Sequence, residues 1–493
     1  MHRRKVAVIG GGLGGLSCAI RLARAGFEVD LFERSAKAGG KLAEEWIGPY
    51  RFDAGPTVVT LPEVFAELFC VAGEQIEDNL TFIPIDPLCT YYYPDGTRLK
   101  AYREPAAFAS EVQRAVGEPP EHLLQFLEHS RRIHDAAAPM FLHRSLPSLG
   151  ELLSVRGLRD LSRLPRADAL RSMHSANLRA FSDRRMVQLF DRFATYNGSN
   201  PYRAPATLNL ISAVEHLFGA YTVEGGIRKI ADAITELAIR AGVRLHCSTS
   251  VERVRVDRSQ ATGIAIEGQN RRYDFVVSNA DVALLHRDLL GERESSRGST
   301  HNSSSALVML LAVAQRFPEI GLHSVFFSAD YRREFTQIFD RHELPSDPTV
   351  YLHVSCKANA SDAPPDGENW YLLVNAPPDS GQDWTALGDA LLERAVRKVE
   401  LSLGRQISNR IMASRIITPR DIELRSGSYR GSLYGPSSNN WNSAFKRHAN
   451  RVRGVRFLYA CGGSAHPGGG MPLAILSGKI AAELLVTDAE DNR

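Results

Sequence analysis

The chain has 493 residues, more than one hydrophobic core usually accommodates, so we expect at least two domains. Hydrophobic residues make up 44% of it and charged residues 23%, as is ordinary for a soluble globular protein. The net charge of +3 is too small to indicate a nucleic-acid partner, and none is predicted.

The cysteines and the apolar runs indicate the cellular compartment and the relation to membranes. The six cysteines are scattered, without a CxxC pair or another metal-ligand spacing, which favours reduced thiols in a cytoplasmic protein and no bound metal. The longest uninterrupted apolar run, residues 306–314, has nine residues, whereas a membrane-spanning helix needs about 20. We expect no signal peptide, and any contact with a membrane is expected to be peripheral.

The first predicted unit is a strand, a turn, a helix and a second strand at the N-terminus. An apolar run at residues 6–9 meets a glycine-rich turn, a helical pattern runs through Ala25, and a second apolar run ends on Glu33. The turn has the spacing GxGxxG, formed by Gly10, Gly12 and Gly15, with Gly14 beside them. This pattern is the fingerprint of a dinucleotide-binding βαβ unit, and a plain strand-to-helix turn is the alternative.

Each part of the fingerprint has a physical role. The first glycine permits a tight turn, the second lets a pyrophosphate approach the backbone, and the third lets helix and strand pack closely. The phosphate then lies at a helix N-terminus, where free N–H groups and the helix dipole favour negative charge. Glu33 is placed where a carboxylate accepts hydrogen bonds from a ribose diol.

Glycines beside basic residues follow, at Gly39, Gly40 and Lys41, and again at Gly55. Bare backbone N–H groups in such a loop suit phosphate or flavin contact, and an ordinary polar loop is the alternative. Residues 62–72 then have the apolar spacing of a short helix.

The pattern changes to short strands and then to helices. Two strands joined by a Pro-Asp-Gly turn at residues 94–96 predict a hairpin. Helices are expected from residue 105 to about residue 223. The predicted strands are residues 80–85, 90–93 and 98–102, and the first predicted helices are residues 105–116 and 121–135.

Residues 156–192 form an unusually basic part of this helical region. They hold nine arginines against four aspartates, a formal charge of +5, with leucines interleaved. An arginine-rich amphipathic stretch of this kind can lie on an anionic lipid surface. A solvated helical face with salt bridges is the alternative.

Strands return after the helical insertion. A Gly-Gly turn and a helix through Gly242 precede an alternating run at residues 243–256, and two further strands are predicted at residues 263–266 and 275–278. Residues 292–305 lack apolar side chains and are predicted to be a linker. Beyond them an α+β layer is indicated by strands at 306–314, 324–327, 350–354 and 370–375 and a helix at 386–403.

The last informative stretch is residues 457–485. A strand at residues 457–461 leads to Gly462 and Gly463, and three glycines at 468–470 precede Pro472 and a helix from about residue 473 to residue 485. Glycine lets backbone approach a planar ring, and a helix N-terminus can face a negatively charged carbonyl or phosphate. We therefore predict one cofactor held by both ends of the chain.

Several stretches, taken in order, span nearly the whole chain: residues 10–33, GGK at 39–41, residues 52–69, YPDGT at 93–97, NPYRAP at 200–205, VEGGI at 223–227, RGSLYG at 430–435 and CGGSAHPGGGMP at 461–472. In these stretches the chain resembles the bacterial-type phytoene desaturase family, which are FAD-dependent oxidoreductases acting on acyclic carotenoids. The HPGGGMP element is the most specific of them. Within the family the chain is similar to the 1-hydroxycarotenoid 3,4-desaturases.

The resemblance implies an α/β fold with a discontinuous, Rossmann-like FAD domain of the two-dinucleotide-binding type. Residues 1–75, 220–295 and 455–493 would form it, and residues 76–219 and 296–454 would form an α+β substrate region with a helical, membrane-facing part. The implied location is the cytoplasm, at the surface of the inner membrane. The sequence leaves the oligomeric state open.

The activity implied is desaturation of an acyclic carotenoid, with 3,4-desaturation of a 1-hydroxylated carotenoid as one form of it, by hydride transfer to FAD and loss of a proton. Oxygenation of a terminal methyl group to an aldehyde, an FAD amine oxidase and a non-catalytic lipid escort are the alternatives. Apolar walls must bind such a polyene. Eight aromatic residues are candidates for lining these walls, with packing in the core as the alternative: Phe65, Phe69, Tyr91, Tyr92, Tyr93, Phe326, Phe327 and Tyr351.

His466 is the residue we expect to handle the proton, since imidazole exchanges protons near neutral pH; ordering its own loop is the alternative role. Asp183 is a second candidate for a polar role at the substrate channel. Related flavoproteins often place an acidic residue after the last strand, where this chain has Gly462, Gly463 and Ser464. The predicted cofactor contacts are Gly10, Gly12, Gly14, Gly15, Glu33, Gly39, Gly40, Lys41, Gly55, Val251, Gly462, Gly463, Gly470, Met471 and Pro472.

Overall fold

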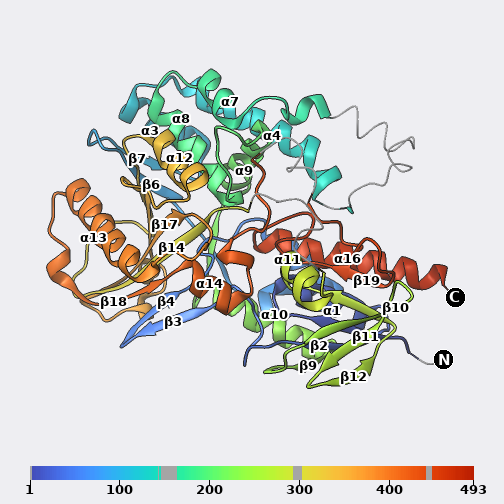
Figure 1. The fold of residues 1–493 in the computed structure, drawn as a ribbon. Helices are drawn as coiled ribbons and strands as arrows, with labels where there is room; N and C mark the ends of the chain where they lie inside the picture. The colour runs from blue at the N-terminus through green and yellow to red at the C-terminus, as the bar shows by residue number, and fades with distance from the viewer. Residues whose placement is uncertain (1–2, 143, 146–163, 293–301, 440–446, 493) are drawn as a thin grey trace.

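The computed structural model describes residues 3–142, 144–145, 164–292, 302–439 and 447–492. Its lower part in Figure 1 is built around a parallel sheet in the order β19-β13-β1-β2-β9. These strands come from three distant parts of the sequence: β1 (Lys5–Ile9), β2 (Glu28–Phe32), β9 (Arg244–His246), β13 (Phe275–Ser278) and β19 (Leu458–Ala460).

Alternation along β1 shows why this sheet has two covered faces. Val6 and Val8 pack into one apolar cluster with the helices, whereas Ala7 and Ile9 pack into another with a small antiparallel sheet. The helices on the first face are α1 (Leu13–Arg24), α2 (Pro62–Ala72), α10 (Arg228–Arg240) and α16 (Met471–Asp491). The small sheet on the second face consists of β10 (Arg253–Asp257), β11 (Gln260–Ile266) and β12 (Gln269–Arg272).

A second, mixed sheet lies beside the first part and has the order β18-β14-β17-β16-β15-β6-β7. Its centre is β14, whose nine residues are all buried. Its strands are β6 (Cys89–Tyr92), β7 (Arg98–Ala101), β14 (Ser305–Val313), β15 (His323–Phe326), β16 (Val350–Val354), β17 (Glu368–Ala376) and β18 (Ile411–Ile417). Associated with this part are the strand pair β3 (Glu44–Ile47) and β4 (Tyr50–Asp53) and the helices α13 (Trp384–Leu403) and α14 (Pro419–Ser426).

A helical layer covers the far face of the second sheet, at the top of Figure 1. Its core joins Phe108, Phe126 and Phe190 from the helices to Tyr91 and Val325 from the strands. The helices are α3 (Pro105–Val116), α4 (Pro120–Phe141), α7 (Met173–Ala180), α8 (Arg184–Asp191), α9 (Leu210–Ala213) and α12 (Tyr331–Thr336). The strand pair β5 (Phe82–Pro84) and β8 (Tyr221–Val223) and the short helix α11 (Val282–Leu284) complete the elements named here.

The predicted α/β class with a Rossmann-like sheet is confirmed, and four predicted elements have the expected bounds: α2, α3, β13 and β16. The division into domains at residues 75, 220, 295 and 455 stays a prediction. The predicted hairpin is also present, because β6 and β7 pair antiparallel around the Pro-Asp-Gly turn.

Other predicted elements were wrong. Residues 243–256 do not form one strand, because the chain turns at Ser248, whose φ is +51°, so β9 and β10 belong to different sheets. The last helix begins at Met471 rather than at residue 473, because proline is tolerated in the first turn of a helix. Strands β12 and β18 escaped prediction because they are largely exposed and lack apolar alternation.

Two predicted segments lie partly outside the described residues. These are residues 156–163 of the basic stretch and residues 293–301 of the predicted linker. Within the described ranges, no helix combines the length and the apolar character needed to cross a bilayer.

Candidate functional site

The two ends of the chain meet at the glycine-rich turn between β1 and α1. Gly10 has a φ of +97°, which glycine adopts without strain. A Cβ on Gly14 would lie 2.8 Å from the Cα of Gly462, and a Cβ on Gly12 would lie 2.8 Å from Asn279 Nδ2. A side chain at Gly12 would therefore collide with Asn279, and one at Gly14 with Gly462, so the predicted N-terminal and C-terminal glycines lie together.

Glu33 lies directly after β2 with its carboxylate turned to the same place. Its Oε2 accepts a hydrogen bond from the N–H of Gly11 and its Oε1 accepts one from Ser35, both at 2.8 Å. The N–H of Gly39 donates to the main-chain oxygen of Gly11 at 2.8 Å, so the second glycine loop folds back on the first. The predicted loop is therefore part of one cradle with the fingerprint.

Val251 belongs to the same end of the cradle. The N–H of Thr249, two residues earlier, donates to the main-chain oxygen of Glu33 at 2.9 Å. Val251 is half-buried and packs against the apolar cluster that contains Ile9 and Phe32. This position is next to the carboxylate expected to hold a ribose.

Two long helices begin in this cradle without a side-chain cap. Gly12 precedes α1 and Gly470 precedes α16, and neither helix has a capping side chain on its first N–H groups. Gly470 has a φ of +108° and open space where a side chain would stand. Free N–H groups at helix N-termini suit a pyrophosphate at α1 and an electron-rich carbonyl of a flavin ring at α16. The residues present therefore fit FAD.

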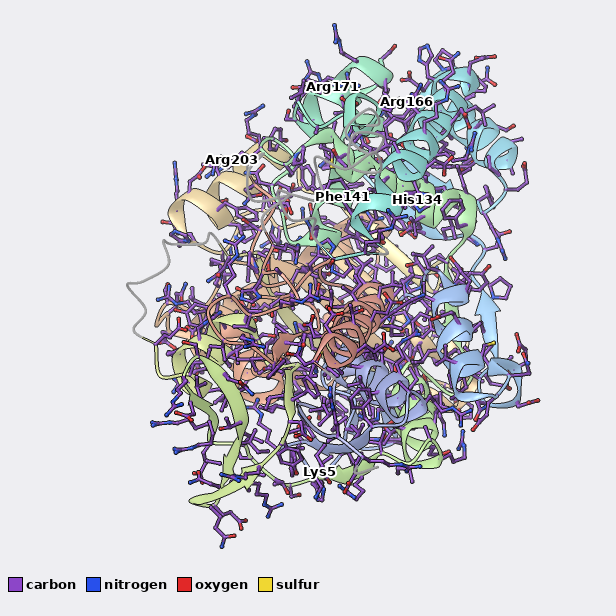
Figure 2. All side chains as sticks on the ribbon, turned by 90° about the vertical axis from the view of Figure 1, so that its right-hand side faces the viewer. Lys5, His134, Phe141, Arg166, Arg171 and Arg203 are labelled. Atoms are coloured by element: carbon purple, nitrogen blue, oxygen red, sulfur yellow. The ribbon has the colours of Figure 1, made fainter. Side chains whose placement is uncertain are left out.

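A cavity of about 500 Å³ extends from this cradle into the protein. Its size is within the range of small-molecule and cofactor sites. At the cradle it is lined by predicted residues, namely Gly40, Lys41, Gly55, His466, Gly470, Met471 and Pro472. At its other end it reaches the helical layer at Phe141 and Leu142, and Figure 2 shows Phe141 well inside the outline of the molecule.

His466 lines the cavity and is buried. Its Nε2 donates to the main-chain oxygen of Arg144 at 2.7 Å, while its own carbonyl accepts from Ser477 and Asn450. Burial lowers the pKa of His466 to about 4, so the imidazole is neutral at physiological pH. Its Nδ1, which has no hydrogen-bond partner among the described residues, is then an acceptor.

Arg447 is a buried site residue that sequence reasoning missed. It lines the cavity and donates to the main-chain oxygens of Tyr434 at 3.1 Å and Gly463 at 3.2 Å, and to Asn197 Oδ1 at 2.7 Å. Burial lowers its pKa to about 10, which leaves it charged at neutral pH. The predicted Gly463 thus contacts the cavity through Arg447, while Lys41 donates to the main-chain oxygen of Leu433 at 2.5 Å.

Asp183 is placed differently from what was expected of it. It precedes α8, where its carboxylate accepts from the N–H of Arg185 at 2.7 Å and forms an ion pair with the guanidinium of the same residue at 2.6 Å. Residues that line the cavity come from other positions of this region, among them Arg192 and Tyr196. Asp183 is therefore the N-cap residue of α8.

Asn279 was also missed. It follows β13 at the carboxyl edge of the parallel sheet, and its Nδ2 donates to the main-chain oxygen of Gly10 at 3.3 Å. Its position directly after an apolar strand is the pattern that could have identified it, because binding residues collect at this edge of such sheets.

The cavity wall corrects the aromatic prediction. Of the eight aromatic residues proposed, Tyr351 lines the cavity, while the other seven belong to buried apolar clusters. The wall also holds polar residues that sequence reasoning did not single out, namely Thr57, Arg192, Tyr196, Glu215, Tyr371 and Tyr434. They come from distant parts of the chain, so no local spacing links them.

Comparison with known proteins places these features in a family. The model of the family described as flavin containing amine oxidoreductase matches residues 13–486. The chain is 34% identical to a 1-hydroxycarotenoid 3,4-desaturase of Flavobacterium sp. (strain P99-3), over 98% of this chain and 99% of that protein. It is 31% identical to a 4,4'-diapolycopene oxygenase of Methylomonas sp, over 99% of each.

A solved structure shares the fold. An oxidoreductase from Methanosarcina mazei superposes with a TM-score of 0.64 at 16% identity, over 97% of this chain and all of that one. The predicted resemblance to the carotenoid desaturases is confirmed by the full-length relatives, and FAD is confirmed as the cofactor. The chain therefore belongs to the flavin-containing amine oxidoreductase family and, within it, is an FAD-dependent oxidoreductase of the carotenoid desaturase group.

Proposed function

We propose that this protein desaturates an acyclic carotenoid, with a 1-hydroxylated carotenoid as substrate and its 3,4 bond as the site of reaction. The observation that carries the proposal is one cavity that joins the flavin cradle at Gly470 to an apolar interior. The 34% identical relative named as a 1-hydroxycarotenoid 3,4-desaturase supports the choice of substrate. Both reaction partners can thus meet in one cavity.

The chemistry must act on a chain without an activated leaving group. Two C–H bonds break and one C=C bond forms, so one hydrogen leaves with its electron pair and the other as a proton. FAD supplies the acceptor for the hydride. The apolar walls bind the polyene and exclude water. Because no water is then available, a side chain must accept the proton.

His466 is our candidate for this proton. A neutral imidazole with a free Nδ1 is a base, and the hydrogen bond from Nε2 to the main-chain oxygen of Arg144 fixes which nitrogen accepts. The same hydrogen bond orders the loop, so the two roles considered for His466 are compatible. Asp183 is not assigned a part in the reaction, because its carboxylate caps α8.

The alternatives receive less support. The relative named as a 4,4'-diapolycopene oxygenase keeps terminal oxygenation as the second candidate reaction. An amine oxidase would need a recognisable site for an amine, and the full-length relatives quoted above are carotenoid enzymes. A lipid escort would have no need for two uncapped helices at a cofactor cradle.

We further propose that the helical layer docks on the surface of the inner membrane, from which the polyene enters. Leu170 has 93% of its surface exposed and Leu178 has 42%, and the exposed Arg166 and Arg179 lie in the same stretch of sequence. Figure 2 places Arg166 and Arg171 at the opposite end of the molecule from Lys5 of β1. Exposed leucine beside arginine suits an anionic lipid surface.

The test is a product analysis. Purified holoenzyme is incubated in vesicles with acyclic carotenes and hydroxylated carotenes, and products are identified by mass. We expect a loss of two hydrogens per turnover. Gain of oxygen would favour the oxygenase, and the absence of product from every carotenoid, with flavin bound, would reject both reactions.

A further inference from the structure

A buried polar cluster lies in the wall of the cavity, within the helical layer. It consists of Arg192, Tyr196 and Glu215, which line the cavity, and of Tyr91 in the core behind them, and we call it the Arg192 cluster. Arg192 and Tyr196 belong to a 3-10 helical turn, Arg192–Asn197, that follows α8, and Glu215 belongs to a π-helical turn, Val214–Phe218, that follows α9. Such irregular turns often mark functional sites because they redirect side chains.

The charged members of the cluster are almost fully buried. Arg192 is 7% exposed and Glu215 is 4% exposed, yet both line the cavity together with Tyr196. The guanidinium of Arg192 is held between three rings, since its Cζ lies 4.9 to 5.4 Å from the ring centres of Tyr91, Phe193 and Tyr196. The position of the charge is therefore fixed.

The hydrogen bonds inside the cluster leave groups unused. Arg192 Nη2 donates to the hydroxyl of Tyr91 at 3.0 Å, and the hydroxyl of Tyr196 donates to Glu215 Oε2 at 2.6 Å. Arg192 Nη2 and Glu215 Oε1 are 3.8 Å apart, too far for a hydrogen bond. Glu215 Oε1 thus accepts no hydrogen bond from Arg192, and the buried Nε of Arg192 has no hydrogen-bond partner among the described residues.

Unused donors and acceptors of buried charges are costly, so this arrangement favours a ligand that satisfies both. A hydroxyl group does so, because it accepts one hydrogen bond and donates another. The neighbouring wall is apolar, with Ile211, Val214 and Val325 lining the same cavity. The surroundings thus match a hydrocarbon chain that carries one hydroxyl.

We infer that the Arg192 cluster binds the terminal hydroxyl group of the substrate. Glu215 accepts a hydrogen bond from this hydroxyl, and Arg192 donates one to its oxygen. This inference rests on the proposed function and deepens it, because it names the residues that select a hydroxylated polyene over a hydrocarbon. A site built for a hydroxyl rejects the analogue that lacks it, since the buried polar groups are then left unpaired. The hydroxyl would also fix how far the chain enters.

The test compares two substrates that differ only in the hydroxyl. Holoenzyme is supplied in vesicles with a hydroxylated acyclic carotene and with its deoxy counterpart of the same carbon skeleton. Binding is measured from the shift of polyene absorbance, and kcat/KM is measured separately. We expect a preference for the hydroxylated compound of roughly a hundredfold or more in kcat/KM, and a preference of the same sense in binding.

Two variants and a control assign the preference to the cluster. Arg192→Met and the milder Glu215→Gln should each reduce the preference at least about tenfold, mainly by weakening use of the hydroxylated compound. Tyr371→Phe removes another hydroxyl from the cavity wall, so any loss it causes should fall equally on both substrates. Glu215→Gln keeps an acceptor for Tyr196 and is the variant to use if Arg192→Met does not fold.

The outcomes separate this inference from the proposed function. Equal binding of the two compounds by the wild-type protein would overturn the inference, as would variants that lose both compounds equally, since that result indicates a purely structural ion pair. A wild-type protein that binds the hydroxylated compound preferentially but dehydrogenates neither would support the cluster and reject the proposed reaction.

Discussion

The cofactor cradle and the cavity are built in different ways. The cradle is made of backbone: Gly12 and Gly14 leave no room for side chains, and the first N–H groups of α1 and α16 have no side-chain cap. The cavity beyond it is made of side chains that converge from the second sheet, the helical layer and the loops between them. We therefore expect substitutions in the cradle to be tolerated less well than substitutions in the cavity wall.

This difference concerns how each region achieves specificity. Phosphate and ring carbonyl groups are bound by oriented N–H groups whose position is set by glycine and helix geometry. A polyene offers few such groups, so the cavity must select by shape and by isolated polar contacts such as the Arg192 cluster. We therefore expect the cradle to be shared across the family and the cavity wall to differ between its members.

The largest expected effect is in the cradle. Gly12→Val should weaken FAD binding by roughly a hundredfold or more, because a Cβ there would lie 2.8 Å from Asn279 Nδ2 and fill the space of the pyrophosphate. Visible absorbance of the purified protein reports the bound flavin. Gly321→Ala is the control, since the nearest atoms to its added Cβ are 3.8 Å away. Undiminished FAD content in Gly12→Val would refute the assignment of the cradle.

The next effect is on the free energy of unfolding, through His466 at the cavity wall. The pKa of His466 is lowered from 6.5 to about 4, so its neutral form is favoured in the folded protein. Between these values the unfolded chain binds more protons, so stability is complete above about pH 6.5 and falls as the pH approaches 4. The expected loss is on the order of 3 kcal/mol. Denaturant unfolding of wild type and His466→Gln should show a smaller loss in the variant, and identical pH profiles would contradict this assignment.

Turnover should depend on the same residue. His466→Ala removes the proposed proton acceptor and should slow the chemical step roughly a hundredfold, with FAD still bound. Single-turnover reduction of the flavin by substrate measures this step, and flavin content serves as the internal control. An unchanged rate would leave His466 with the loop-ordering role alone.

The smallest effect is expected at the outer surface of the helical layer. Leu170→Ser should weaken binding to anionic vesicles about fivefold, since one exposed leucine contributes roughly 1 kcal/mol or somewhat more at a lipid surface. Leu401→Ser is the matched control, because Leu401 is 75% exposed on α13, which lies apart from α7, the helix that begins shortly after Leu170, in Figure 1. Equal binding by the two variants would contradict the proposed docking face.

The same contrast explains what the sequence could predict. The first cradle elements lie within residues 6–33, so a fixed spacing of glycines and one carboxylate identified them. Strands with strong apolar patterns, such as β13 and β16, were found for the same local reason. The contact of Gly14 with Gly462 could only be inferred from the glycine-rich character of both stretches.

The cavity could not be predicted in this way. Thr57, Arg192, Glu215 and Tyr351 meet only after the second sheet and the helical layer have assembled, so no spacing in the sequence connects them. A buried tyrosine of the core and one at the cavity wall also cannot be told apart by their type of element, since Tyr91 and Tyr351 both lie in short, largely buried strands. The cofactor could therefore be predicted from the sequence, whereas the residues of the cavity wall could be identified only from the structure.

We propose that the carotenoid delivers its electrons to the flavin within the one cavity. Anaerobic mixing of the holoenzyme with one equivalent of a hydroxylated acyclic carotene in vesicles tests it most directly. We predict loss of the visible absorbance of oxidised FAD, together with an equal amount of product that has two hydrogens fewer. A flavin that stays oxidised, or a product that forms only with dioxygen and contains added oxygen, would contradict the account.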